Sequence, residues 1–337
     1  MTAETSLRVA VAGGGSWGTA LAHVLAVAGH EVTLVLRDAS VAQAVNTRHE
    51  NPRYLPGKAI HPGVKASTSQ DALQSADLLV MAVPCQHQRS WLENARSSLP
   101  RRCLVVNASK GLENGTCLTM SRVVAEELAP LHPRYAVLSG PSFAAEVMDG
   151  QPTAVVLGCE DENVGARLRE IFSTPFFRCY SSTDVTGVET GGALKNVMAI
   201  AAGIGDGLGF GSNARAALIT RGLAELSRLG TAMGARPLTF MGLSGLGDLV
   251  LTCTGGLSRN RQVGLRLGRG EKLEEIVASL GMVAEGVKTA VAARDLARKL
   301  HVSVPVTEAM CRVLHENAYP AMAVRSLMER PLKEEQE

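Results

Sequence analysis

Short apolar segments alternate with segments of helical periodicity from the start of the chain to about residue 180. Segments with strand character lie at 7–13, 31–36, 77–83, 103–107, 135–140, 153–158 and 176–180. Helical patterns occur at 19–28, 86–99 and 162–172. This alternation predicts a parallel sheet covered by helices, here an eight-stranded unit.

The strand pattern stops near residue 184, and helical patterns occupy the rest of the chain. They cover 185–208, 213–230, 258–268, 271–280, 284–300 and 305–316. Such a change of element type, in a chain of 337 residues, predicts a boundary between two domains. We place one domain at 1–185, an all-α domain at 186–330 and a charged, frayed tail at 331–337.

One helical pattern is unusual because a single charged residue lies within it. Residues 190–205 read T-G-G-A-L-K-N-V-M-A-I-A-A-G-I-G, and Lys195 is their only charge. The small and apolar neighbours of Lys195 predict a helix buried on nearly all sides. Burial lowers the pKa of a lysine, which can then transfer protons near neutral pH. The alternative is a packing helix whose lysine reaches water along its apolar stem.

A glycine-rich motif joins the first strand pattern to the first helical pattern. Residues 13–18, G-G-G-S-W-G, have the form G-x-G-x-x-G inside a βαβ unit of about 30 residues. Glycines let the backbone approach a pyrophosphate, and the following helix N-terminus supplies amides and a positive dipole. The alternative is a flexible turn without a ligand. We predict an α/β fold, with a Rossmann-like dinucleotide-binding domain at 1–185 whose Gly13, Gly15 and Gly18 contact the cofactor.

The residues after the second strand pattern bear on the choice of cofactor. Arg37 stands where an acidic residue would bind the ribose 2′-hydroxyl of NAD, and Asp38 follows it. An arginine at this place accommodates the 2′-phosphate of NADP. We therefore predict NADP as the preferred cofactor, with NAD also accepted. Asp38 can equally serve as the first-turn acid of the next helix.

Two further strand patterns end in polar turns. Lys110 follows the pattern at 103–107, and the turn G-P-S-F-A at 140–144 follows the pattern at 135–140. Open parallel sheets bind ligands beyond the carboxyl ends of their strands, so these turns are predicted at the mouth of one site. A solvent-exposed loop lysine is the alternative for Lys110.

A glycine-rich break in the helical half carries a second group of polar residues. Asp248 and Thr252 are four apart and share a face if the stretch between them is helical. Ser258 can cap the next helix, with Arg259 and Asn260 in its first turn. A basic and an amide side chain at a helix N-terminus form either a phosphate site or a cap with a solvated arginine.

Composition excludes several classes of function. With 46% hydrophobic and 20% charged residues, the chain resembles soluble globular proteins. Its net charge of +2, with acids and bases interspersed, indicates neither a nucleic-acid nor a membrane partner. The seven scattered cysteines lack metal-site spacing, which predicts reduced thiols and no metal. Neither a signal peptide nor an apolar run of membrane-span length is evident, so a cytoplasmic location is predicted.

Six motifs occur in order along the chain. They are G-G-G-S-W-G-T-A-L-A (13–22), N-A-S-K-G-L-E (107–113), S-G-P-S-F-A-A-E-V (139–147), G-A-L-K-N-V-M-A-I-A-A-G (192–203), S-G-L-G-D-L-V-L-T-C (244–253) and T-G-G-L-S-R-N-R (254–261). Together they resemble the bacterial NAD(P)-dependent glycerol-3-phosphate dehydrogenases over residues 7–320. The resemblance implies reversible hydride transfer between glycerol 3-phosphate and dihydroxyacetone phosphate, which supplies glycerol 3-phosphate for phospholipid synthesis.

The resemblance also implies roles for individual residues, with Lys195 as the group that donates and accepts the proton. It implies substrate contacts from Lys110, Gly140, Ser142, Lys195, Asn196, Asp248, Thr252, Ser258, Arg259 and Asn260. It implies cofactor contacts from Ser16, Trp17, Arg37, Tyr54, Lys110, Ala144, Arg259, Val283 and Glu285, although the segment around Tyr54 carries no distinctive motif. The two small-molecule substrates are the implied partners, and a homodimer is left open.

Two other functions remain as alternatives. Another two-domain reductase, acting on 2-keto acids, could use the S-R-N turn at 258–260 to bind a carboxylate. A non-catalytic NADP-sensing protein would use the helical domain for a partner. A sensor does not need an isolated lysine in an apolar helix facing the cofactor, which speaks against the second alternative.

Overall fold

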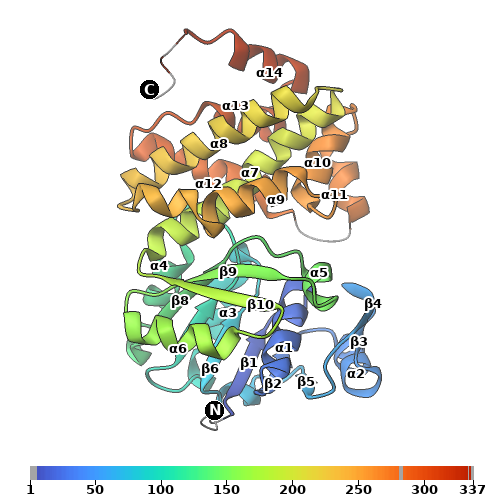
Figure 1. Ribbon diagram of the computed structural model, residues 1–337, viewed down its shortest axis with the longest axis vertical. Helices are drawn as coiled ribbons and strands as arrows, with labels where there is room; N and C mark the ends of the chain where they lie inside the picture. The colour runs from blue at the N-terminus through green and yellow to red at the C-terminus, as the bar shows by residue number, and fades with distance from the viewer. Residues whose placement is uncertain (1–5, 281–283, 333, 335–337) are drawn as a thin grey trace.

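The computed structural model describes residues 6–280, 284–332 and 334 of the chain. A sheet with helices occupies one half of the molecule, and a group of helices occupies the other (Figure 1). Strands lie before residue 183 in the described chain, and the long helices follow from Val185. This confirms the predicted fold class, a Rossmann-like part followed by an all-α part.

Eight strands form the main sheet in the order β10-β9-β8-β7-β6-β1-β2-β5. Their bounds are β1 Arg8–Ala12, β2 Glu31–Val35, β5 Val64–Ser67, β6 Leu78–Met81, β7 Leu104–Asn107, β8 Arg134–Ser139, β9 Thr153–Gly158 and β10 Phe177–Ser182. The strands from β8 to β5 pair in parallel, whereas β9 runs antiparallel to β8. A separate antiparallel pair consists of β3 (Glu50–Asn51) and β4 (Leu55–Ala59).

Helices bury both faces of the sheet, and alternate strand residues point to opposite faces. The covering helices are α1 Ser16–Val27, α2 Ala39–Arg48, α3 Gln88–Ala95, α4 Met120–Glu127, α5 Ala144–Met148 and α6 Glu162–Phe172. In β1, Val9 and Val11 join the apolar cluster under α1, α2, α5 and α6. Ala10 and Ala12 join the cluster under α3 and α4. Burial on two faces explains the nearly continuous apolar runs that predicted these strands.

The helical half is built around α7, Val185–Gly207. The helices around or beyond it are α8 Ser212–Ala232, α9 Asp248–Thr254, α10 Arg259–Gly268, α11 Leu273–Leu280, α12 Glu285–Lys299, α13 Pro305–His315 and α14 Pro320–Met328. Apart from Thr186, every residue of α7 from Val185 to Ile204 is buried. A Cβ on Gly203 would lie 2.0 Å from the Arg261 carbonyl oxygen. The small residues of α7 therefore let the backbone of α10 pack directly against the backbone of α7.

The sequence pattern missed or misjudged several elements. It predicted eight strands but did not locate β5, whose four residues include Lys65 and Ser67. The β3–β4 pair and the helices α4, α5 and α14 were also not predicted, since they are short or lack a strong apolar stripe. The helix predicted at 86–99 is divided into a 3-10 turn (Cys85–His87), α3 and a second 3-10 turn (Arg96–Ser98). Of the predicted tail, residues 333 and 335–337 lie outside the described residues.

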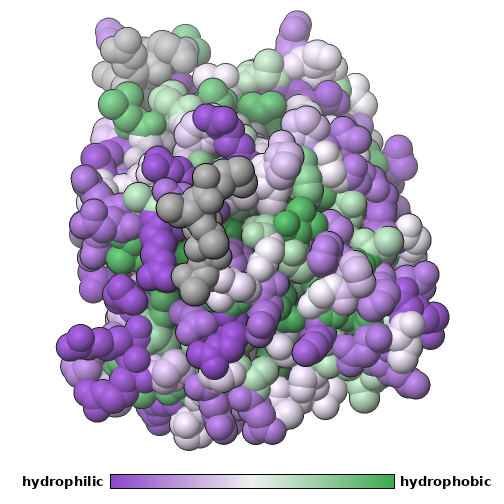
Figure 2. All heavy atoms as spheres, turned by 60° about the horizontal axis from the view of Figure 1, so that its bottom comes forward, coloured by the Kyte–Doolittle hydropathy of each residue, from purple (hydrophilic) through white to green (hydrophobic). Residues whose placement is uncertain are grey.

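The molecular surface is mixed in character. On the face turned forward in Figure 2, hydrophilic and hydrophobic residues are interspersed. Within the described ranges, no helix combines the length and the apolar character needed to cross a membrane.

Candidate active site

The glycine-rich motif forms the turn between β1 and α1 in a conformation that favours glycine. Gly13 has a φ of 111°, and a Cβ there would lie 2.7 Å from the Ala82 carbonyl oxygen. A Cβ on Gly18 would lie 1.9 Å from the Gly13 carbonyl oxygen, so this glycine lets α1 approach the strand. Gly15 faces open space and caps α1 without a side-chain bond to its first amides. These amides are suited to bind an anionic group.

Asn51 holds this turn from a segment that the sequence did not connect with it. Its buried Nδ2 donates to the Gly14 carbonyl oxygen at 3.0 Å and to Thr19 Oγ1 at 2.8 Å. Its Oδ1 accepts from the Tyr54 amide at 3.2 Å, which places Tyr54, a predicted cofactor contact, beside the turn. No motif surrounds Asn51, so only the fold reveals its role.

Asp38 is engaged in capping α2, whereas Arg37 is exposed just beyond β2. The Asp38 carboxylate accepts from the amides of Ser40 and Val41 and pairs with Arg53 at 2.9 Å. Hydrogen bonds from Ser40 and then Arg53 lower the pKa of Asp38. Asp38 is therefore the N-cap of α2, one position before the first-turn role considered from the sequence.

Lys195 is buried in α7, with 6% of its surface exposed. Its Nζ donates to the Asp248 carboxylate and, at 2.8 Å, to Oγ1 of Thr252. Asp248 and Thr252 lie one turn apart on α9, as their spacing predicted, and Thr252 donates to the Asp248 carbonyl oxygen at 2.6 Å. Lys195 thus has fixed partners in the interior, which excludes the alternative of a lysine that extends to water.

Lys110 reaches the same carboxylate from the sheet half. Its Nζ donates to Asp248 Oδ2 at 2.7 Å and to the Gly140 carbonyl oxygen at 3.1 Å. Ser142 Oγ donates to that same carbonyl at 3.0 Å, so the turn after β8 also belongs to the site. Each oxygen of one buried carboxylate therefore binds a different lysine, at the point where the two halves meet.

Burial has the largest effect on the ionisation of Lys195. It lowers the pKa of Lys195 to about 8, with the Asp248 carboxylate opposing and the Lys110 ammonium reinforcing the shift. Burial would raise the pKa of Asp248, but Lys110 and Lys195 outweigh it and hold that pKa below its usual value. Near neutral pH, a negative Asp248 thus faces a Lys195 ammonium that can release its proton.

A chain of hydrogen bonds joins α7, α10 and α12 beside this cluster. Asn260 Nδ2 donates to Asn196 Oδ1 at 3.0 Å, and Asn260 Oδ1 accepts from the Gly286 amide at 3.1 Å. Ser258 accepts from the Arg261 amide at 3.2 Å and so caps α10, as predicted. These bonds fix the two asparagine side chains relative to each other.

Arg259 connects the helical half to the glycine-rich turn, and Glu285 connects it to the turn before α3. Arg259 Nη2 donates to Ser16 Oγ at 3.4 Å, and Glu285 Oε1 accepts from the Cys85 amide at 3.2 Å. Burial lowers the pKa of Arg259 and raises that of Glu285, while their mutual attraction opposes both shifts. Cationic side chains outnumber carboxylates in the site: Lys110, Lys195 and Arg259 against Asp248 and Glu285. This excess suits an anionic ligand.

The structure describes two of the three remaining predicted residues. Trp17 and Ala144 lie in the first turns of α1 and α5, and both pack against one apolar cluster. Val283 lies outside the described residues. Among the residues that the structure describes, no group of three or more His, Cys, Asp or Glu side chains is placed to hold a metal ion.

Comparison with known proteins agrees with this geometry along nearly the whole chain. Residues 8–165 match the model of the N-terminal part of NAD-dependent glycerol-3-phosphate dehydrogenases, and residues 184–325 match that of the C-terminal part. The chain belongs to this family. The match confirms the resemblance inferred from the ordered motifs.

Individual members of the family are similar to the chain over nearly its full length. A glycerol-3-phosphate dehydrogenase [NAD(P)+] from Nitratidesulfovibrio vulgaris is 61% identical over 330 residues, 98% of this chain and 100% of that protein. One from Desulfovibrio desulfuricans is 60% identical over 329 residues, 98% of this chain and 99% of that protein. The crystal structure of glycerol-3-phosphate dehydrogenase from Coxiella burnetii has a TM-score of 0.92 at 39% identity, covering 96% of this chain and 99% of that chain.

Two buried hydroxyl groups beside Lys110 were not found from the sequence. Ser139 Oγ and Thr289 Oγ1 have no hydrogen-bond partner in the described part of the chain. A Cβ on Gly192 would lie 2.7 Å from Ser139 Oγ and 3.4 Å from Lys110 Cγ. A Cβ on Gly111 would lie 3.3 Å from Thr289 Oγ1. Serine and threonine in apolar segments give no sequence signal for this placement.

Proposed function

We propose that the chain is an NAD(P)-dependent glycerol-3-phosphate dehydrogenase that transfers hydride reversibly between sn-glycerol 3-phosphate and dihydroxyacetone phosphate. The observation that carries this proposal is the buried Asp248 carboxylate with Lys195 on one oxygen and Lys110 on the other. A proton donor beside a second cation suits a ketone oxygen that becomes negative during reduction. Family membership supports the choice of substrate.

The residues of the glycine-rich turn fit a nicotinamide dinucleotide. Gly15 leaves open space before the first amides of α1, and Gly13 and Gly18 allow the close turn. Further contacts are proposed from Ser16, Trp17, Arg37, Tyr54, Lys110, Ala144, Arg259, Val283 and Glu285. When bound, the nicotinamide supplies the hydride for reduction and takes it up in oxidation.

Lys195 is proposed to manage the proton of the reaction. In reduction its ammonium stabilises the negative charge that develops on the ketone oxygen and then gives that oxygen a proton. In oxidation the neutral amine takes the hydroxyl proton back. Asp248 and Thr252 hold Lys195 Nζ by hydrogen bonds, so the proton is presented from a fixed position.

The remaining polar groups are proposed to bind the substrate. Arg259 and Asn260, at the N-terminus of α10, would anchor its phosphate, with Ser258 fixing the start of the helix. Binding energy from a phosphate remote from the reacting carbon orients the ketone toward Lys195. The other proposed substrate contacts are Lys110, Gly140, Ser142, Asn196, Asp248 and Thr252.

A spectrophotometric assay separates this function from its two alternatives. NADPH oxidation is expected with dihydroxyacetone phosphate and not with pyruvate or ketopantoate. Turnover with a 2-keto acid alone would place the chain among the keto acid reductases. Cofactor binding without turnover, unaffected by three-carbon phosphates, would favour the NADP-sensing protein.

Arg37 tests the proposed preference for NADP. Arg37→Ala is expected to weaken NADPH binding relative to NADH by about 1–3 kcal/mol, because a charge-assisted contact to the 2′-phosphate is lost. Fluorescence titration with both cofactors measures the difference. Equal losses for the two cofactors would mean that Arg37 does not bind the 2′-phosphate. Arg48→Ala, an exposed position at the end of α2, is the matched control.

We also propose the roles of the two domains, the cellular location and the assembly of the protein. We assign residues 1–185 to a dinucleotide-binding domain and residues 186–330 to a substrate-binding and catalytic domain, with Lys110, Gly140 and Ser142 of the first domain completing the substrate site. A cytoplasmic location is supported by the seven free, buried thiols, and no nucleic-acid partner is proposed. A homodimer is the proposed assembly, which sedimentation of the purified protein would test.

A further inference from the structure

Lys110 lies in a segment without regular secondary structure. Residues 108–119 connect β7 to α4, and no helix or strand fixes their path. Lys110 must nevertheless hold its ammonium 2.7 Å from Asp248 on the other half of the molecule. The Ala108 amide and Ser109 Oγ fix the start of the segment by bonds to the Met81 and Val83 carbonyl oxygens, so the part after Lys110 must be held by other contacts.

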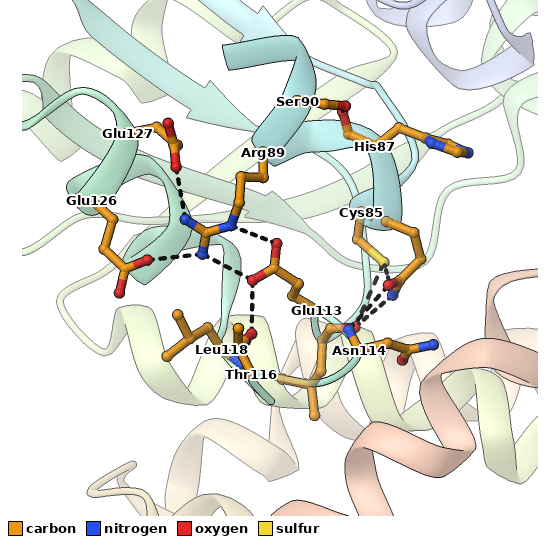
Figure 3. Close-up of polar contacts among 12 residues, drawn as sticks. Cys85, His87, Arg89, Ser90, Glu113, Asn114, Thr116, Leu118, Glu126 and Glu127 are labelled. Carbon is orange, nitrogen blue, oxygen red and sulfur yellow. Dashed lines mark hydrogen bonds and ion pairs between the residues drawn. The ribbon is translucent and has the colours of Figure 1, made fainter. Parts of the chain in front are cut away.

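Glu113, three residues after Lys110, is bound by an arginine of α3. Arg89 donates through Nε and Nη2 to the two carboxylate oxygens of Glu113, both at 2.9 Å. Thr116 Oγ1 adds a bond to Glu113 at 2.7 Å. Figure 3 shows the Arg89 guanidinium between Glu113 on one side and Glu126 and Glu127 of α4 on the other. The segment is thus tied to two neighbouring helices at once.

The Gln86 side chain supports the same segment by binding the backbone of the segment. Its Nε2 donates to the Leu112 carbonyl oxygen at 2.7 Å, and its Oε1 accepts from the Asn114 amide at 3.0 Å. The backbone on both sides of Glu113 is therefore bound to the turn before α3. The same turn supplies the Cys85 amide that binds Glu285.

The segment around Lys110 is packed closely on two sides, by the turn before α3 and by α7. A Cβ on Gly111 would lie 2.4 Å from Cys85 Sγ, and a Cβ on Gly192 would lie 3.4 Å from Lys110 Cγ. Because the 2.7 Å bond from Lys110 to Asp248 tolerates little displacement, a loss of the contacts at Glu113 would disturb it.

We propose that Glu113, held by Arg89, is a positioning residue that keeps the Lys110 ammonium on the Asp248 carboxylate. The inference rests on the proposed function, because it assumes that Lys110 acts on the substrate. The carboxylates that bind Arg89 differ in their exposure and in the segment that carries them, and this difference permits a test. Glu113 is 12% exposed and belongs to the Lys110 segment, whereas Glu126 is 54% exposed and belongs to α4. Exposed ion pairs contribute little to stability.

The test compares Glu113→Ala with Glu126→Ala in the full-length protein. Each variant removes one carboxylate from Arg89, but only the first releases the segment. We expect Glu113→Ala to lower kcat/KM for dihydroxyacetone phosphate by about 10-fold or more, since small displacements of catalytic groups are costly. We expect Glu126→Ala to stay within about 2-fold of the wild type. NADPH affinity and the unfolding midpoint establish that both variants fold.

A double-mutant cycle with Lys110→Ala shows whether Glu113 acts through Lys110. In the Lys110→Ala background, Glu113→Ala should change kcat/KM by less than about 2-fold, because no ammonium remains to be positioned. Full additivity of the two effects, or equal losses in Glu113→Ala and Glu126→Ala, would overturn the inference. If Lys110→Ala itself retains a normal kcat/KM, Lys110 does not act on the substrate, and the proposed role of Lys110 is contradicted together with the inference.

Discussion

Replacing Lys195 by methionine is expected to lower the turnover number by about 10²–10⁴-fold, the usual effect of losing a general acid. Methionine keeps most of the volume of the buried stem but cannot donate or accept a proton. NADPH affinity should barely change, because the proposed pyrophosphate site lies at residues 13–18, on another part of the chain. Steady-state kinetics and a cofactor titration on the same preparation measure both quantities.

The control for this variant is Lys65→Met. Lys65 is exposed on β5, the edge strand of the sheet, so its loss should leave turnover unchanged. Near-normal turnover in a folded Lys195→Met protein would show that Lys195 is only a structural lysine. A loss of NADPH affinity as large as the loss of turnover would indicate general damage to the site.

Arg259→Ala is expected to raise the KM for dihydroxyacetone phosphate by about 10–100-fold, because hydrogen bonds to a charged group contribute about 1.5–3 kcal/mol. The phosphate is present in the ground state and in the transition state, so the effect should fall mainly on KM. A smaller decrease in turnover is expected as well, since the anchored phosphate aligns the ketone. NADPH affinity should fall modestly, because Arg259 also contacts Ser16.

Arg266→Ala is the matched control on the same helix. Arg266 lies in the last turn of α10 and pairs with Glu271 outside the site. Its replacement should leave the KM for dihydroxyacetone phosphate unchanged. An Arg259→Ala protein with a normal KM and reduced turnover would contradict the anchoring role and assign Arg259 to the chemical step.

The sequence could reveal the site residues that carry a local pattern. Lys195 stood out because it was the only charge in an apolar helix, and the i, i+4 spacing of Asp248 and Thr252 placed them on one face. The glycine-rich turn was recognisable by its G-x-G-x-x-G spacing, and close backbone contacts require glycine at Gly13 and Gly18. These features depend on residues that are near one another in the chain.

The contacts that complete the site join distant parts of the chain, and no local pattern encodes them. Lys110 and Asp248 are 138 positions apart, and Cys85 and Glu285 are 200 apart. Asn51 lies outside every motif and Glu113 ends the motif at 107–113, but neither was given a role, because their partners Gly14 and Arg89 are distant in the chain. Strand β5 was missed for a related reason, since its pairing with β2 compensates for a weak apolar pattern.

The pH dependence of turnover in both directions tests most directly whether Lys195 carries the proton. Reduction of dihydroxyacetone phosphate needs the ammonium, so kcat should fall as the pH rises through the Lys195 pKa of about 8. Oxidation of glycerol 3-phosphate needs the neutral amine, so kcat should rise through the same pH range. The residual activity of Lys195→Met should show neither this fall nor this rise in kcat. The account would be contradicted if the pH dependence of kcat persisted in this variant. It would also be contradicted if kcat changed with pH in the same direction for both reactions.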